Sequence, residues 1–290
     1  KLYPDLHRWI ALSVLFFPTV VFWGSGIFKD TITLSALGAA TYTFHRIFIE
    51  KRVSFFSVLL MLISFWVIFS IKKYILLCFF PAILLWWVAT YLSRISSLML
   101  RMILAPLTGI IAIFLASFAV LKVGEDDPRY QVSKLAETAK ITAYDIRYGW
   151  GARTGEGSGY TLGELDGSWQ SMVVLAPQAI NISLFRPYLW EVINPLMFLS
   201  AVEGSVLLLL TLHLVWRVRW KIFTYLQKPD VLFCFVFAMI FAFAVGVSTF
   251  NFGTLSRYKI PMMPYFLLML GMIHAYWKRD RKLAEFDATE

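Results

Sequence analysis

Charge and cysteine are both scarce in this sequence. Charged residues make up 16% of the 290 residues, whereas about a quarter is usual for soluble domains. The two cysteines, Cys78 and Cys234, both lie inside apolar runs. Their positions argue against a disulfide framework and predict that both thiols pack in the interior.

Recognisable catalytic motifs are also absent. The sequence has no glycine-rich nucleotide-binding loop, no clustered His and Cys residues, and no Ser-His-Asp pattern. We therefore expect no metal and no cofactor. The net charge of +9 would suggest nucleic acid in a soluble protein, but here the basic residues sit at the ends of apolar runs. We expect no nucleic-acid partner.

Apolar residues are abundant. They make up 59% of the chain, aromatic residues make up 17%, and the mean hydropathy is +0.68. One soluble core could not bury that much apolar surface, whereas lipid can cover it. We predict an all-α, polytopic transmembrane bundle with about eight spans and one large extracytoplasmic loop. A helix needs about 20 apolar residues to cross a bilayer, and we place the spans at Arg8–Trp23, Ile27–Phe44, Val53–Ile71, Tyr74–Tyr91, Met99–Leu121, Ile193–Trp216, Val231–Ser248 and Ile260–Trp277.

The predicted order is spans 1 to 5 over residues 1–121, a loop over 122–192, spans 6 to 8 over 193–277, and a tail over 278–290. The first pair of spans is a candidate re-entrant segment, because Pro18 and the turn at residues 24–26 interrupt it. The first apolar run lacks a cleavage site and the sequence begins at Lys1, so we expect a processed chain or part of a longer one.

Basic residues predict the orientation, because they favour the cytoplasmic side. We predict a bacterial cytoplasmic membrane with both termini on its cytoplasmic side. The cytoplasmic ends of the spans then hold Arg46, Lys51, Arg52, Arg94, Arg217, Arg219, Lys221, Lys228, Lys278, Arg279, Arg281 and Lys282. The outer segment from Lys122 to Glu191 has seven basic and nine acidic residues. Asp127 and Pro128 have the pattern of a helix start, and apolar spacing then predicts an amphipathic helix over 128–148 that lies on the membrane surface or caps the bundle.

Several cations fall at the outer boundary, against the topology bias: Lys29, Lys72, Lys73, Arg186, Arg257 and Lys259. An anionic ligand such as a lipid-linked diphosphate would explain them, since Arg and Lys both bind phosphate. The alternative is that they anchor helix ends, and for Lys72 and Lys73 we prefer that reading. For Arg186 the structural alternative is an ion pair with Glu191.

Carboxylates on the same side are candidate general bases. Asp30 follows Lys29 directly, and Glu191 precedes the sixth span. Glu203 lies about one-third of the way into that span. A carboxylate at such a depth is costly, so we expect Glu203 to face the bundle interior and to be paired.

Three segments resemble bacterial polysaccharide-assembly membrane proteins. Residues 17–30 read FPTVVFWGSGIFKD and resemble a P-S-x-x-F-W-x-S-G-x-x-K-(D/E) signature. Residues 251–264 read NFGTLSRYKIPMMP and resemble an R-Y-(R/K)-x-P-x-x-P element, and residues 184–191, LFRPYLWE, look like a third shared segment. The groups that carry these elements are the O-antigen-polymerase-like and C-type-glycosyltransferase-like proteins, especially those of Bacteroidetes.

The resemblance implies sugar transfer or polymerisation on the outer face from a polyprenyl-phosphate or polyprenyl-diphosphate donor. By position, Lys29, Arg186, Arg257 and Lys259 would bind the phosphate or diphosphate, and Asp30 or Glu191 would be the acid/base group. C-type glycosyltransferases carry their catalytic Asp in the first outer loop, and Asp30 is its equivalent only if no spans precede this chain.

Two further interpretations stay open. One is a non-enzymatic membrane subunit that anchors or scaffolds a larger complex through a protein partner on the outer loop. The other is a transporter of lipid-linked oligosaccharides, for which Glu203 is the one supporting feature. The expected partners are membrane lipid and a polyprenyl-(di)phosphate-linked saccharide.

Overall fold

The computed structural model describes residues 6–26, 28–97, 134–150, 158–163 and 165–287, with a few more between 99 and 131. Over these residues the chain is helical, as predicted, and its one extended pairing is an isolated bridge between Gly159 and Asn251. Most of the predicted span Met99–Leu121 and the predicted helix start at Asp127 lie outside the described residues.

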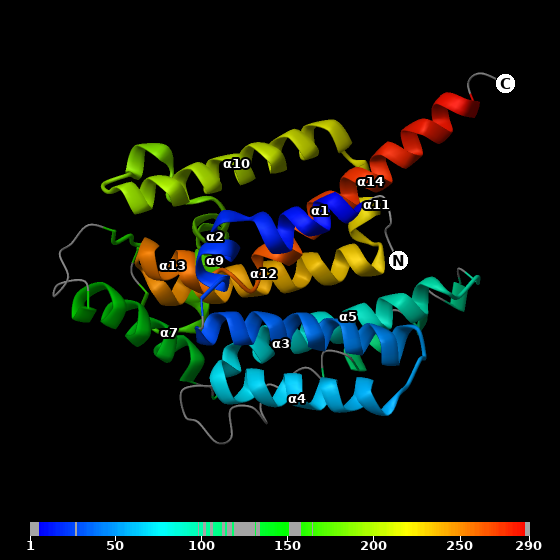
Figure 1. Cartoon of the computed structure of the whole chain (residues 1–290), viewed down its shortest axis with the longest axis horizontal. Helices are drawn as coiled ribbons and strands as arrows, with labels where there is room; N and C mark the ends of the chain where they lie inside the picture. The colour runs from blue at the N-terminus through cyan, green and yellow to red at the C-terminus, as the bar shows by residue number, and fades with distance from the viewer. Residues whose placement is uncertain are drawn as a thin grey trace.

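The first part of the chain forms three antiparallel passes after a broken first helix (Figure 1). Its elements are α1 (His7–Ala11), the π-helical η2 (Leu12–Phe16), α2 (Pro18–Gly24), α3 (Lys29–Phe44), the π-helical η3 (His45–Ile49), α4 (Phe55–Ile71) and α5 (Lys73–Ser93).

The second part begins with four described helical elements in the segment predicted to be the outer loop and continues with five more, three of which are long. Its elements are α7 (Leu135–Tyr144), η6 (Asp145–Trp150), α9 (Trp169–Phe185), η7 (Leu189–Glu191), α10 (Pro195–Val218), α11 (Lys221–Leu226), α12 (Pro229–Thr249), α13 (Phe252–Tyr258) and α14 (Met263–Asp287).

Length and composition allow three of the described helices to cross a membrane, or up to five if each bent pair counts as one span. The three single helices are α5, α10 from Met197, and α12. The bent pairs are His7–Phe16 with Pro18–Gly24, at 50°, and α13 with α14, at 66°. The apolar helix α4 has 17 residues and is shorter than the others. The described part of the chain thus supports a membrane protein without fixing eight spans.

Proline accounts for both bends. Pro18 occupies the first position of α2, where its missing N–H breaks the ladder that would join η2 to α2. Pro261 and Pro264 lie at the junction of α13 and α14. Both breaks lie close to one end of the bundle, so they bring backbone ends and polar side chains to that end.

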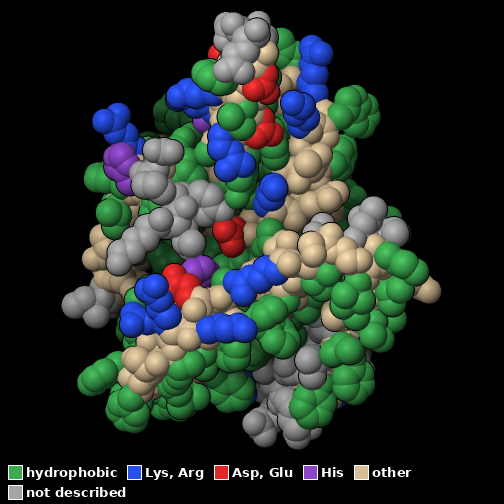
Figure 2. Space-filling model, turned by 90° about the vertical axis from the view of Figure 1, so that its right-hand side faces the viewer, with side chains coloured by type: hydrophobic (Ala, Val, Ile, Leu, Met, Phe, Trp, Pro, Cys, Tyr) green, Lys and Arg blue, Asp and Glu red, His purple; other side chains and the backbone are tan. Residues whose placement is uncertain are grey.

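Basic side chains gather at the opposite end. In Figure 1 the ends of α3, α5 and α14 and the start of α12 lie on the right. Figure 2 shows this end, with Lys and Arg side chains spread over it and hydrophobic side chains around its rim. The ion pairs and ring contacts here include Arg52 with Glu50, and Arg217 with Trp277.

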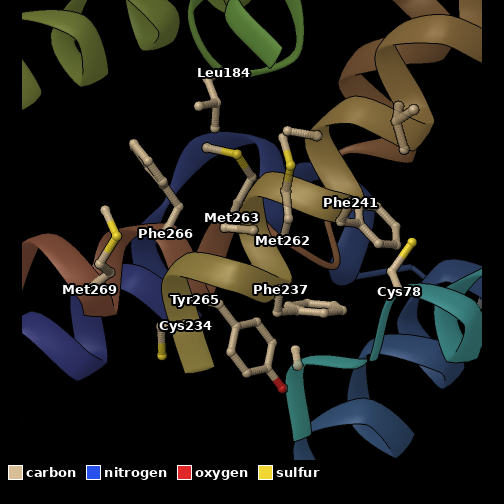
Figure 3. Close-up of a cluster of buried hydrophobic side chains, with 14 of the residues drawn as sticks. Cys78, Leu184, Cys234, Phe237, Phe241, Met262, Met263, Tyr265, Phe266 and Met269 are labelled. Carbon is tan, nitrogen blue, oxygen red and sulfur yellow. The ribbon is translucent and has the colours of Figure 1, made fainter. Parts of the chain in front are cut away.

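Helix α12 forms the centre of the bundle, where it contacts α5, α9, α14 and α7. Its buried face carries Phe233, Phe237 and Phe241, and Tyr265 of α14 packs edge-on against the first two rings. Figure 3 shows part of this cluster, with Phe237, Phe241 and Tyr265 labelled together with both cysteines. Cys78 and Cys234 are buried and free, as the sequence predicts.

The segment 122–192 packs on the bundle through its described residues. Within the range 128–148 that was predicted to be an amphipathic helix, α7 buries Ala136, Ala139 and Ala143 and packs against α12. Helix α9 was not anticipated from the sequence. It packs against α12, where the Ser183 hydroxyl donates to the Ala242 carbonyl over 2.6 Å.

Candidate functional site

The segment around α13 lies at the end of the bundle away from the basic surface. Phe250 ends α12 in the left-handed conformation with φ 39°, and the Asn251 side chain caps α13 by accepting from the backbone N–H groups of Gly253 and Thr254. This turn sends Arg257 and Lys259, two residues apart, toward two different carboxylates. The candidate site therefore lies around the segment that follows the C-terminal end of α12.

The first carboxylate is Asp30, at the start of α3. One of its oxygens accepts from Lys72 Nζ, and the other accepts from Arg257 Nε at 2.6 Å. Asp30 is only 3% exposed. The triad joins the start of α3, the α4–α5 turn and α13, three segments that are far apart in sequence.

Aromatic rings enclose the two cations of this triad. Lys72 Nζ lies 5.3 Å from the centre of the Tyr258 ring, and Arg257 Cζ lies 5.6 Å from that of Trp23. Such cation–π contacts add to the ion pairs where water is excluded. Lys72 does not extend to the surface, because its side chain is buried and paired with Asp30, and this pair joins the start of α5 to the start of α3.

The second carboxylate is Glu203 of α10. Its Oε2 accepts from the Thr19 backbone N–H at 2.7 Å and also from the Thr19 hydroxyl. Lys259 Nζ lies 3.3 Å from Oε1, and the Lys259 side chain is 1% exposed. The sequence-based expectation that Glu203 is buried and paired is confirmed.

The third pair joins Arg186 and Glu191 across η7, the structural alternative that the sequence raised. Arg186 Nε donates to Glu191 Oε2 at 2.9 Å, its Nη2 donates to Oε1, and the Tyr188 backbone N–H donates to Oε2 at 2.8 Å. Burial alone would raise the pKa of Glu191, but these donors and the Arg186 charge outweigh it and hold the pKa below its ordinary value.

A groove of about 790 Å³ opens beside these pairs, between the broken first helix and α10. Its lining is mainly apolar, from residues such as Phe16, Phe22, Val206 and Leu210, with polar groups that include Asn194 and Ser256. Glu203 is the one charged residue of the described chain that lines it. Trp23 and Phe252 also line it, and their rings contact Arg257 and Arg186 respectively.

The sequence-predicted residues therefore meet in pairs. Asp30 binds Arg257, Glu191 binds Arg186, and Lys259 binds Glu203, while Lys29 is exposed at the start of α3. The two residues that the prediction left out of the site are Lys72 and Glu203. For Glu203 the sequence held a signal, because a carboxylate lies deep in an apolar span. For Lys72 it held none, because nothing in the sequence distinguished Lys72 from Lys73.

Among the described residues, no group of three or more His, Cys, Asp or Glu side chains could hold a metal ion. No protein-family model, curated protein or solved structure matches this chain. The function must therefore be argued from the site itself.

Proposed function

We propose that the chain is a multi-pass protein of a bacterial cytoplasmic membrane, with about eight passes, both termini cytoplasmic and the 122–192 segment outside. The helix directions in Figure 1 support this arrangement, because α3, α4 and α5 run in alternate directions between the two ends, and so do α10, α12 and α14. The basic end shown in Figure 2 then faces the cytoplasm, as the distribution of Lys and Arg favours.

At the outer end, the protein transfers or polymerises saccharides linked to a polyprenyl phosphate or diphosphate. One observation carries this proposal: Arg257, Arg186 and Lys259 contact Trp23, Phe252 and Glu203 respectively, and these three partners all line one apolar groove. Together with Lys29, Lys72 and Lys73 they give six cations against the three anions Asp30, Glu191 and Glu203. The excess positive charge suits a phosphate group.

Arg257 is the best phosphate ligand of the set. Its side chain is 32% exposed, and Asp30 engages it through Nε. Its terminal N–H groups have no other acceptor among the described residues and remain for a ligand. Arg186 commits both Nε and Nη2 to Glu191, so its role is weaker in this geometry.

The two candidate acid/base groups, Asp30 and Glu191, also differ in how fully their ion pairs occupy them. Asp30 is buried and both its oxygens accept from cations, which fits a residue that positions Arg257 and Lys72. Glu191 is partly exposed, and its proton affinity is reduced by Arg186. As a base, Glu191 would have to exchange Arg186 for the reacting hydroxyl.

The test is glycan assembly in cells that depend on this protein. Arg257→Ala and Arg186→Ala are expected to abolish the glycan while the folded protein persists in the membrane. Arg52→Ala, at the opposite end and with a side chain 75% exposed, is the matched control and should behave as the unaltered protein. Normal glycan from both site variants would refute the proposal.

The scaffold subunit is the second candidate function. It is favoured by exposed apolar side chains after α9, namely Leu189, Trp190 and Ile193, which a partner could cover. Against it, described residues of the outer segment such as Tyr160, Leu162 and Leu165 are buried in the chain's own core. Co-purification of a stoichiometric partner lost in Trp190→Ala would favour the scaffold, and a stable solitary protein would count against it.

A further inference from the structure

The groove beside α10 has an unusual charge pattern. Of its described lining residues, one carries a carboxylate and none carries a positive charge. A phosphate placed inside the groove would meet Glu203 and no cation. The part of a ligand that contacts Glu203 in this groove should therefore carry no negative charge.

Glu203 also has an unused acceptor. Its Oε2 is occupied by the two donors of Thr19, whereas Oε1 is buried and has no hydrogen-bond partner among the described residues. Lys259 Nζ lies 3.3 Å from Oε1 and compensates its charge, but without hydrogen-bond geometry. A buried acceptor without a donor is costly, so a ligand that supplies one O–H group gains a charge-assisted hydrogen bond.

The rest of the groove suits a hydrocarbon chain. Phe16, Phe22, Val206 and Leu210 line it and are exposed on the outer surface of the described chain, so the groove opens toward the surface that would face lipid. Polar groups of Asn194, Ser200 and Ser256 lie in the same lining as Glu203. The lining thus combines a polar region with apolar walls, as an amphiphile requires.

We propose that this groove binds an amphiphile with an uncharged, hydroxyl-bearing head group and a hydrocarbon tail, with Glu203 Oε1 accepting the hydroxyl proton in a hydrogen bond. The proposed transferase needs a hydroxyl-bearing acceptor beside its phosphate-bearing donor, and this groove would bind that acceptor. The inference rests on the proposed function only for this acceptor role. Arg257, the proposed ligand of the donor phosphate, contacts the ring of Trp23, which lines the groove.

The experiment uses the full chain in phosphatidylcholine nanodiscs. A long-chain alcohol that carries a photoreactive diazirine in its tail is compared with its methyl ether, and labelled peptides are identified by mass spectrometry. The alcohol should label the groove peptides with about tenfold higher apparent affinity than the ether, as expected for one hydrogen bond to a charged group. Equal labelling by both probes overturns the inference.

Two variants test the assigned atoms. Glu203→Gln should remove most of the preference for alcohol over ether, and the double variant Glu203→Gln with Lys259→Met repeats the test without an unpaired buried cation. Val206→Trp narrows the apolar part of the groove without touching the ion pair and should abolish labelling by both probes. Unchanged preference in every folded Glu203 variant overturns the assignment.

Competition separates the possible sources of the ligand. An uncharged alkyl glucoside should displace the alcohol, whereas phosphatidylglycerol, which has hydroxyls and a negative charge, should displace it at least tenfold less well. Equal displacement would mean that the groove takes bulk anionic lipid and would overturn the inference. If the protein binds the diphosphate-linked lipid but not the alcohol, this site alone is refuted. If it binds the alcohol but not the diphosphate-linked lipid, the proposed donor site alone is refuted.

Discussion

Two residues of one short segment, Arg257 and Lys259, join several helices at the end of the molecule that carries the candidate site. Arg257 reaches Asp30 at the start of α3, and Lys259 reaches Glu203 within α10. The Tyr258 ring between them lies against Lys72. A change at any of these positions therefore affects the packing of several helices as well as the chemistry of the site.

The buried pair of Glu203 and Lys259 gives the first prediction. Lys259→Ala should destabilise the folded protein by about 3–5 kcal/mol, because it leaves a buried carboxylate without its cation. The double variant Glu203→Leu with Lys259→Met should lose much less. Thermal unfolding followed by circular dichroism measures both, and equal losses in the single and double variants would show that the pair does not act as a unit.

The pair of Arg186 and Glu191 gives a prediction for pH. The pKa of Glu191 in the folded protein lies below its ordinary value of 4.5. The unfolded state therefore binds a proton first as the pH falls, and the stabilisation from this pair is full above about pH 4.5 and is lost as the pH drops through the folded pKa.

Hydrogen exchange of the peptide that contains residues 186–192 measures this loss. Protection should be constant from pH 7 to 5, after correction for intrinsic exchange, and should fall below pH 4.5. Glu191→Gln should show low protection with little pH dependence. If Glu191→Gln keeps the fall in protection below pH 4.5 that the unaltered protein shows, another titrating group causes that fall.

At the scale of helices, close approach explains how α9 docks. A Cβ atom added to Gly246 of α12 would overlap the Ala179 carbonyl group, and one added to Gly204 of α10 would lie 2.5 Å from the Phe185 carbonyl oxygen. Glycine at these two positions lets the backbones meet, which is a common device where helices pack in membranes. Helix α9 therefore docks closely against both α12 and α10.

Gly246→Ala tests this contact. It should destabilise the protein by about 1–3 kcal/mol through overpacking. Gly38→Ala is the matched control, because a Cβ at Gly38 of α3 meets nothing within 4 Å. The control should be neutral or slightly stabilising, since alanine is the better helix former. Equal thermal stability of the two variants would contradict the close docking of α9.

The sequence was sufficient to predict the long apolar helices and insufficient to predict α9. The predicted ranges for α4, α5, α10 and α12 agree with the structure within about two residues at each end, because apolar length defines them. Helix α9 follows a glycine-rich stretch and contains Pro177, so its start and its burial gave no clear pattern. Its position depends on contacts with α12 and α10 that no local pattern encodes.

The same distinction holds for the site. Charge at the predicted outer boundary identified Arg186, Arg257 and Lys259 as candidates, and the depth of Glu203 in an apolar helix identified it as buried and paired. The pairing of Asp30 with Lys72, rather than with the adjacent Lys29, depends on how α3 meets the α4–α5 turn. Such a long-range contact cannot be read from one sequence.

At the scale of the whole molecule, the two ends differ in how their charges are used. At the basic end Arg52 and Arg281 are mostly exposed, whereas at the other end Lys72 and Lys259 are buried and paired. Exposed cations suit a cytoplasmic surface, and buried pairs beside a groove suit a binding site. The proposed orientation follows from this difference.

Cysteine labelling tests the orientation. Cys78 and Cys234 are buried and should react little, so cysteines introduced by Lys51→Cys and Trp190→Cys report on the two ends. In intact spheroplasts a membrane-impermeant maleimide should label the position at 190 and spare the position at 51. Labelling of position 51 alone would reverse the orientation and place the Arg257 site in the cytoplasm.

The central claim is that the outer end binds a lipid-linked phosphate through Arg257. Its most direct test is the affinity of the nanodisc-embedded protein for an undecaprenyl-diphosphate-linked saccharide, compared among the unaltered protein, Arg257→Ala and Arg52→Ala. We predict that the unaltered protein and Arg52→Ala bind equally and that Arg257→Ala binds about tenfold or more weakly, as loss of a charge-assisted contact requires. Equal binding by Arg257→Ala, or no binding by the folded unaltered protein, would contradict the account.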